Sequence, residues 1–197
     1  MLAYNTKRLQ LLSGYEMHRF GDWLLNSQGD DGNWRHRSPL VGHFRDRESG
    51  VDFLVTGNHL ARGNENVRRR QAGGLRKWAE AQSLPLLAIG DYNFDYDFHT
   101  KTGNQAFQLF TKDGVWKWLR PEELIDSNWS DNGPKLPDDQ RADRNPDSIL
   151  DFIFVAGPAQ QWQAKSWVVV RPGDFPDSDE TSDHRPVAAV VEMAVGQ

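Results

Sequence analysis

The sequence lacks cysteine altogether in 197 residues. The absence of thiols excludes disulfide bonds and thiolate metal sites, although a cysteine-free chain can work in any compartment. Long apolar runs are also absent, and none approaches the roughly 20 residues that a membrane-spanning helix needs. The segment after Met1 has no basic region followed by an apolar one, so we expect a soluble chain without a signal peptide and leave its compartment open.

Positive charge is also in short supply. The chain has 23 Lys and Arg against 28 Asp and Glu, a formal net charge of -5, so its surface as a whole is not expected to attract nucleic acid. Basic residues nevertheless crowd one region, which contains Arg62, Arg68, Arg69, Arg70, Arg76 and Lys77. Two interpretations of this group are open: the solvated face of a helix, or a rim that steers phosphate groups towards a nearby site.

The chain does have large aromatic side chains. Hydrophobic residues make up only 38% of it, yet eight Trp and ten Phe supply large apolar surfaces. A chain of this length is most simply one domain, residues 1–197, and it can bury a substantial core.

Strand-like and helix-like stretches alternate along the chain and predict an α/β fold. We expect strands within 2–12 and at 37–46, 51–58, 86–90, 116–119, 149–155, 165–170 and 187–193. Helices are expected at 64–82 and 103–112, with a helical turn at 121–124. The stretches 13–36 and 126–147 are rich in turn-forming residues and are predicted to be loops.

The helix expected at 64–82 has one inward stripe. The residues at spacings of four, four, three and four form it: Val67, Gln71, Leu75, Trp78 and Gln82. Gly73 and Gly74 inside the helix each cost about 1 kcal/mol relative to alanine, a cost that close packing of the helix on a sheet would explain.

The stretch 86–93 contains the first candidate site. Its four apolar residues predict a strand buried on both faces, and Gly90 then frees the backbone. Asp91 and Asn93 follow two positions apart, so they point the same way in an extended or tightly turned segment. We expect them to leave the end of a central strand side by side and to point into one cleft, where ligands bind in layered α/β proteins.

Three further stretches place polar residues at the edge of an apolar run. They hold Asn58 and His59, then Asp151, then Asp183 and His184. In chain order the four stretches read N-H-L, G-D-Y-N, L-D-F-I-F and S-D-H-R-P-V. This ordered set resembles the motifs of the endonuclease/exonuclease/phosphatase superfamily, the metal-dependent phosphoesterases related to deoxyribonuclease I.

The resemblance implies an α/β (α+β) fold, a four-layered sandwich of two mixed β-sheets flanked by helices. That superfamily opens with a strand ending in Asn, a helix, and a strand ending in Gln-Glu, whose Glu is a principal metal ligand. Neither motif occurs here, because the only early glutamate, Glu16, lies in Tyr15-Glu16-Met17 after the predicted strand. We therefore expect the later part of the fold, without the first N-terminal strand–helix–strand section.

Asp151 and His184 are expected to form a functional pair. Burying an unpaired carboxylate is costly, so Asp151 inside an apolar strand is normally paired, hydrogen-bonded or bound to a metal. Histidine titrates near neutral pH, and a neighbouring carboxylate can fix its tautomer. Adjacent residues on a strand point to opposite sides, so Asp151 is a better partner for His184 than Asp183, which is left free to bind metal.

The resemblance also implies catalytic roles. His184 would assist the attacking water or stabilise the transition state, with Asp151 orienting it or a metal. His59 would donate a hydrogen bond to a phosphate oxygen or protonate the leaving group, although a histidine at a strand end can also be purely structural. Asp91 would position the water nucleophile or ligate metal, and Asn93 would hydrogen-bond the phosphoryl group.

Metal and substrate contacts follow from the same resemblance. Asp91 and Asp183 are the expected metal ligands, and oxygen ligands with histidine nearby suit Mg²⁺ or Mn²⁺ better than zinc. Asn58 and Arg62, together with Asn93, are the expected substrate contacts.

Two classes of function remain open from the sequence. The first is a Mg²⁺-dependent hydrolase of phosphate esters, a nuclease or other phosphodiesterase, with phosphomonoesters and lipid phosphoesters as alternative substrates. The second is an N-terminally truncated, catalytically inactive fragment or binding protein of the same fold. The expected partner is a phosphate-ester substrate, with nucleic acid among the candidates, and the oligomeric state stays open.

Overall fold

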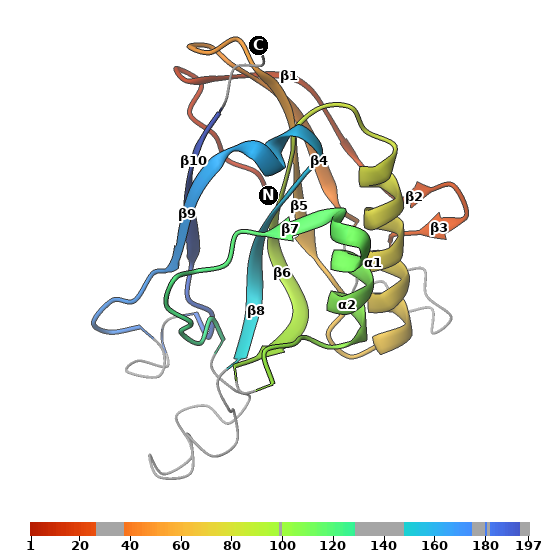
Figure 1. Cartoon of the computed structure of the whole chain (residues 1–197), viewed down its shortest axis with the longest axis vertical. Coiled ribbons are helices and arrows are strands. Elements are labelled where there is room, and N and C mark those ends of the chain that lie inside the picture. Colours follow the sequence, from red (N-terminus) through yellow and green to blue (C-terminus); the bar gives the residue numbers. More distant parts are fainter. Residues whose placement is uncertain (27–37, 99, 129–147, 175–179, 181, 194–197) are drawn as a thin grey trace.

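A six-stranded mixed sheet forms the centre of the molecule (Figure 1). The computed structural model of the chain describes residues 1–26, 38–98, 100–128, 148–174, 180 and 182–193. In spatial order the strands of the sheet are β1 (Leu9–Glu16), β4 (Leu40–Asp46), β5 (Asp52–His59), β6 (Leu86–Asp97), β8 (Ser148–Ala156) and β7 (Trp116–Trp118). Only β5 and β6 run parallel, and the helix between them makes the crossover that a parallel pair needs.

The remaining elements cover the two faces of this sheet. The helices are α1 (Glu65–Glu80) and α2 (Gln105–Thr111), with 3₁₀ turns η1 (Lys112–Gly114) and η2 (Gly157–Gln161). Two small antiparallel sheets pair β9 (Gln163–Val168) with β10 (Val187–Glu192) and β2 (Arg19–Phe20) with β3 (Trp23–Leu24). Figure 1 shows both helices on one face of the large sheet and β9–β10 on the other. No helix in the described part of the chain is long and apolar enough to cross a membrane.

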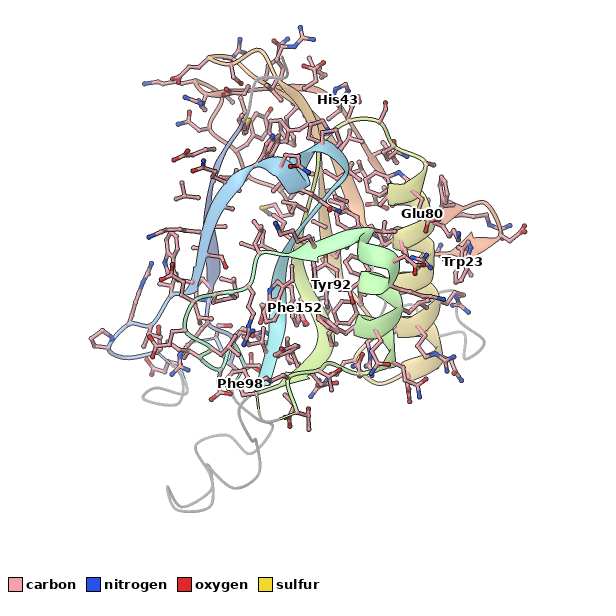
Figure 2. All side chains as sticks on the ribbon, viewed as in Figure 1. Trp23, His43, Glu80, Tyr92, Phe98 and Phe152 are labelled. Carbon is pink, nitrogen blue, oxygen red and sulfur yellow. The ribbon has the colours of Figure 1, made fainter. Side chains whose placement is uncertain are left out.

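Helix α1 begins where the sequence predicts. The Asn64 side chain accepts a hydrogen bond from the Val67 N–H at 3.0 Å, an N-cap that satisfies one of the free donors of the first turn. The two glycines of the helix approach the β2–β3 hairpin, not the central sheet. A Cβ on Gly73 would lie 2.4 Å from the ring of Trp23, which Figure 2 shows beside the helix. A Cβ on Gly74 would lie 2.5 Å from Leu25, directly after the hairpin, and 2.8 Å from Trp23. The predicted close packing therefore exists, but its partner is the hairpin segment.

The main core lies between the helices and the sheet and is largely aromatic. Tyr92 is fully buried, and its ring meets Phe110 of α2 edge-on at 5.3 Å and Phe152 of β8 at 6.0 Å. Figure 2 labels Tyr92 and Phe152 within this core. A second cluster on the opposite face includes Phe53 and Trp162 and is covered by the apolar residues of β10. Strands β6 and β8 are therefore covered on both faces, as the apolar runs of the sequence predict.

Several predicted boundaries differ from the structure. Of the two strands expected within 2–12, the second begins at Leu9 after a turn at residues 6–8 and continues to Glu16 as β1, whereas residues 2–5 form no strand. The predicted loop 13–36 therefore contains the end of β1 and the β2–β3 hairpin up to residue 26. Residues 122 and 123 form a bend, and no helical turn is present at 121–124. Most of the predicted loop 126–147 lies outside the described residues. Within the described residues, the sheet that faces β8 from the side opposite the helices has two strands, β9 and β10.

Candidate active site

Three neighbouring strands bring the predicted polar residues into one row, at the end of β5 and within β6 and β8. His59 of β5 lies directly opposite Asp91 of β6, and Asp91 lies directly opposite Asp151 of β8. Residues that face each other across a sheet project from the same side, so the three side chains are neighbours. With His184 they border a cleft of about 720 Å³ between the large sheet and the segment that leads into β10.

The walls of this cleft are mixed in character. Its apolar lining residues are Met1, Leu2, Leu40, Ile89, Phe152, Ile153, Pro186 and Val187. Its polar lining comprises Ser38, Asn58, His59, Asp91, Asp151, Ser182, His184 and Arg185. Among the described residues, the only Arg or Lys of the lining is Arg185, whose Nη1 donates to the backbone carbonyl of Asp126 at 3.1 Å.

The predicted Asp151–His184 pair is present. The Nδ1 of His184 lies 2.7 Å from the Oδ2 of Asp151, and both side chains are largely buried, at 29% and 18% exposure. The hydrogen bond with Asp151, and the negative charge of that group, raise the pKa of His184 above the usual value of a histidine. The arrangement thus favours an imidazolium that is held in one orientation, with its Nε2 left for other contacts.

A residue that the sequence did not single out, Ser127, fixes this pair. Its hydroxyl is fully buried, donates to Asp151 Oδ2 at 2.9 Å, and accepts the N–H groups of Leu150 and Asp151 at 2.9 and 3.1 Å. Its carbonyl accepts the N–H of Arg185 at 2.8 Å, next to His184. A lone serine in a loop, 24 positions before Asp151, carries no spacing signal that would predict this.

Asp91 is held by the backbone and side chain of Asn93. The Asn93 N–H donates to Asp91 Oδ1 at 2.9 Å, and its amide Nδ2 donates to Asp91 Oδ2 at 3.2 Å and to the carbonyl of Leu60 at 2.9 Å. These contacts need the left-handed backbone of Asn93, at φ 51°. Asn93 is buried at 2% exposure and is not among the cleft-lining residues, so the structure places it behind Asp91.

The carboxylates of Asp91 and Asp151 face each other across β6 and β8, and their negative charges repel. Burial and the negative charge of Asp151 raise the pKa of Asp91 above the usual range of an aspartate. The Nε2 of His59 lies 3.5 Å from Asp91 Oδ2, and His59 is 46% exposed on the solvent side. A cation beside Asp91 would relieve the repulsion between the two carboxylates.

Three of the predicted residues do not join this group. Asn58 lines the cleft, but its amide donates to the hydroxyl of Tyr92 at 2.8 Å. Arg62 forms an exposed ion pair with Asp95 and lies outside the cleft lining. Asp183 is exposed, precedes His184, and is likewise not among the lining residues.

The basic group noted in the sequence is mostly engaged with the protein itself. Arg62 pairs with Asp95, and Lys77 pairs with Glu80. Arg76 pairs with both Asp113 and Glu80. Arg68 donates to the carbonyls of Ala61 and Arg62, and Arg70 donates to the carbonyl of Leu24. Three of these cations, Arg68, Arg70 and Arg76, tie helix α1 to its surroundings, while Arg62, Arg69 and Lys77 are exposed.

The donor set fits a hydrated hard cation but not a closed metal cage. Among the described residues, no three His, Asp or Glu side chains converge into a metal-binding group. Mg²⁺ commonly keeps several waters and uses only one or two protein carboxylates. The partly buried oxygens of Asp91, at 16% exposure and beside a second carboxylate, suit such a cation.

No family model matches the chain, and no curated protein matches it in sequence. Solved structures do match. The endonuclease/exonuclease/phosphatase from Bacteroides vulgatus aligns with a TM-score of 0.63 at 19% identity, over 97% of this chain and 69% of that one. A mannosyl-6-phosphatase from Bacteroides thetaiotaomicron aligns with a TM-score of 0.56 at 21% identity, over 96% of this chain and 69% of that one.

A third match is a variant of beta toxin from Staphylococcus aureus with bound magnesium ions. Its TM-score is 0.51 at 16% identity, over 78% of this chain and 57% of that one. The chain therefore has the α/β fold of endonuclease/exonuclease/phosphatase family proteins, at low sequence identity and over nearly its whole length. It spans between 57% and 69% of the length of these three structures.

Proposed function

We propose that the chain is a metal-dependent phosphoesterase, a nuclease or other phosphodiesterase that hydrolyses a phosphate ester with histidine assistance. The observation that carries the proposal is the Asp151–His184 pair, which faces Asp91 across the β6–β8 ladder at the border of one cleft. An oriented histidine close to a carboxylate of raised pKa, here Asp91, is the arrangement that acid–base chemistry needs. The shared fold with phosphatase and nuclease-type proteins supports the same class of reaction.

The residues at and behind the cleft would have different catalytic roles. His184, held through Nδ1, would present Nε2 to a phosphoryl oxygen and offset its negative charge. Asp91 would orient the attacking water, and Asn93 would keep its carboxylate in place. His59, on the exposed side of Asp91, would give a proton to the leaving group, a contribution of typically 10²–10⁴ in rate.

Mg²⁺, or Mn²⁺, is the metal that this proposal requires. Asp91 would hold it together with several waters, because Mg²⁺ commonly uses only one or two protein carboxylates, and Asp183 lies outside the cleft lining. Once bound, the metal would lower the pKa of a coordinated water and neutralise charge at phosphorus. The magnesium ions of the beta toxin structure support this choice of ion.

We also propose that the chain corresponds to the later part of a four-layered sandwich. Its second sheet has two strands in the described part, and the chain spans 69% of the length of two of the matching structures. None of the described cleft-lining residues is a glutamate, which is consistent with the absence of the Gln-Glu motif from the sequence.

A phosphomonoester or lipid phosphoester is a second candidate substrate class. The described cleft lining offers Arg185 as its sole Arg or Lys, and most of the basic group binds other parts of the protein. A polyanionic strand needs several cations along its path, whereas a single phosphoryl group beside an apolar wall does not.

An inactive binding protein of the same fold is the competing hypothesis. It is favoured by the lack of a three-ligand metal group among the described residues. Under this hypothesis the chain would bind a phosphate ester without turning it over.

The experiment compares Mg²⁺-dependent hydrolysis of bis(p-nitrophenyl) phosphate, p-nitrophenyl phosphate and plasmid DNA. His184→Ala should abolish turnover, whereas His43→Gln should not, because His43 lies outside the cleft lining and faces Asp52. Metal-dependent activity that survives His184→Ala would overturn the assignment. A folded wild-type protein that binds phosphate esters but turns over none of the three would favour the inactive alternative.

A further inference from the structure

Helix α1 buries two polar side chains that the roles assigned so far do not use. Arg68 and Gln71 are 7% and 0% exposed, yet they belong to the face of the helix that packs into the protein. Burying such groups is costly unless every polar contact is made, and burial lowers the pKa of the Arg68 guanidinium. An apolar residue would fill the same space without the free-energy cost of burying a polar group. The polar contacts of Arg68 and Gln71 must therefore offset that cost.

Both side chains bind the backbone of one short segment, Leu60–Arg62, which follows directly on His59. Gln71 Oε1 accepts the N–H of Ala61 at 3.0 Å, while its Nε2 donates to the carbonyl of Leu25 at 3.0 Å. Arg68 Nη1 donates to the carbonyls of Ala61 and Arg62 at 3.0 and 2.8 Å. The segment is therefore fixed from the helix side by both its donors and its acceptors.

The other side of the same segment binds the middle of β6. The Leu60 N–H donates to the backbone carbonyl of Asp91 at 2.9 Å. The Leu60 carbonyl accepts the amide of Asn93 at 2.9 Å, and Asn93 in turn binds both oxygens of the Asp91 carboxylate at 2.9 and 3.2 Å. A continuous set of hydrogen bonds thus runs from α1 to the carboxylate that faces the cleft.

We propose that Gln71 and Arg68 are positioning residues, which fix Leu60–Arg62 and, through Asn93, set the orientation of the Asp91 carboxylate and its distance from His59. Neither touches the cleft, so neither is a catalytic residue. The inference rests on the proposed function for its kinetic consequence, but its structural consequence can be measured independently.

The test uses Gln71→Met, which keeps the volume of the side chain and removes both of its hydrogen bonds. The readout is amide hydrogen exchange at Asn93, whose N–H binds Asp91 Oδ1 and makes no contact with Gln71. Protection of this amide should fall about tenfold or more, because a buried donor left without its acceptor loosens the segment locally. Leu75→Ala is the matched control, since Leu75 is fully buried one turn further along α1 and makes no hydrogen bond to Leu60–Arg62.

Kinetics provide the second readout. If wild type hydrolyses phosphate esters, Gln71→Met should lower kcat about 10- to 100-fold with KM little changed, because small displacements of a reacting group cost rates of that order. Leu75→Ala should lose stability without this selective loss of kcat. If Gln71→Met fails to fold, two variants of Arg68 replace it. Arg68→Lys should keep most of the wild-type kcat, whereas Arg68→Met should not.

The two proposals fail in different ways. An inactive wild type refutes the proposed function alone, and the exchange experiment then still decides the positioning role. Loss of protection centred on Leu60 and Asn93 supports that role. Loss spread evenly over α1 and β6, as in Leu75→Ala, overturns it, and so does an unchanged kcat for Gln71→Met in an active enzyme.

Discussion

The hydroxyl of Ser127 donates to Asp151 through Oδ2, the same carboxylate oxygen that contacts the imidazole of His184. One buried serine therefore joins a loop to the centre of β8 and limits how the Asp151 carboxylate can turn. The backbone N–H groups of Leu150 and Asp151 also depend on this hydroxyl. Its removal has consequences for both stability and activity.

Ser127→Ala should lower the free energy of unfolding by about 1–3 kcal/mol, because it leaves buried N–H groups without an acceptor. It should also lower the rate of ester hydrolysis, since the Asp151 carboxylate loses one of its two fixing contacts. Urea denaturation and initial rates measure the two effects. Ser166→Ala is the matched control: Ser166 is a buried serine that donates to the Leu119 carbonyl and lies outside the cleft lining. Equal activity losses in the two variants would contradict the role of Ser127.

The His184–Asp151 pair should make stability depend on pH in a defined direction. Contact with Asp151 raises the pKa of His184 in the folded state above the unfolded value of 6.5. The pair's contribution to stability is therefore complete below pH 6.5 and is lost as pH rises through the folded-state pKa. Asp151→Asn should lower the pKa of His184 and flatten this part of the curve.

Urea unfolding across the neutral range measures the curve, and the imidazole resonances of His184 report the pKa directly. Asp113→Asn serves as the control, because Asp113 is an exposed carboxylate that pairs with Arg76 away from the cleft. A pKa of His184 that stays the same in Asp151→Asn would show that the contact has no electrostatic effect.

The sequence predicted most elements of the fold because their signals are local. The apolar runs at 86–89 and 149–155 become the central strands β6 and β8, and the inward stripe of α1 is where periodicity places it. The end of β6 could not be predicted, since the strand continues past a bulge between Asp91 and Tyr96. The hydrogen-bonding pattern that allows this depends on the left-handed backbone at Asn93 and Asp95.

The site was predictable where chemistry restricts the choice of partner. A lone carboxylate in an apolar strand needs a partner, and the alternation of strand side chains favoured Asp151 over Asp183 as the partner of His184, as the structure confirms. The residues that hold the site through long-range hydrogen bonds gave no such signal in the sequence. Ser127 and Gln71 act through backbone groups, which any sequence offers, so nothing in their identity reveals what they bind.

Magnesium should stabilise the fold through Asp91. Ionised Asp91 faces Asp151 in a buried setting, an unfavourable interaction that a bound cation relieves. A tenfold excess over the dissociation constant is worth about 1.4 kcal/mol, or a few degrees in melting temperature for a chain of this size. Melting curves with excess MgCl₂ and with EDTA should therefore differ for wild type but not for Asp91→Asn. Asp95→Asn, which removes an exposed carboxylate paired with Arg62, should keep the shift. An equal shift in Asp91→Asn would place the cation elsewhere.

Gly90 should tolerate no side chain, because it allows β6 to approach β5 next to the cleft. It has φ 132°, and a Cβ at this position would lie 2.0 Å from the carbonyl oxygen of Asn58. Gly90→Ala should therefore cost about 3 kcal/mol or more in stability, or prevent folding. Gly63→Ala is the matched control, since nothing lies within 4 Å of a Cβ there, and it should change stability by less than about 1 kcal/mol. Tryptophan fluorescence during urea denaturation follows both variants. A Gly90→Ala protein as stable as Gly63→Ala would mean that the strands can separate at this point, and that the distance between His59 and Asp91 is not fixed by the backbone.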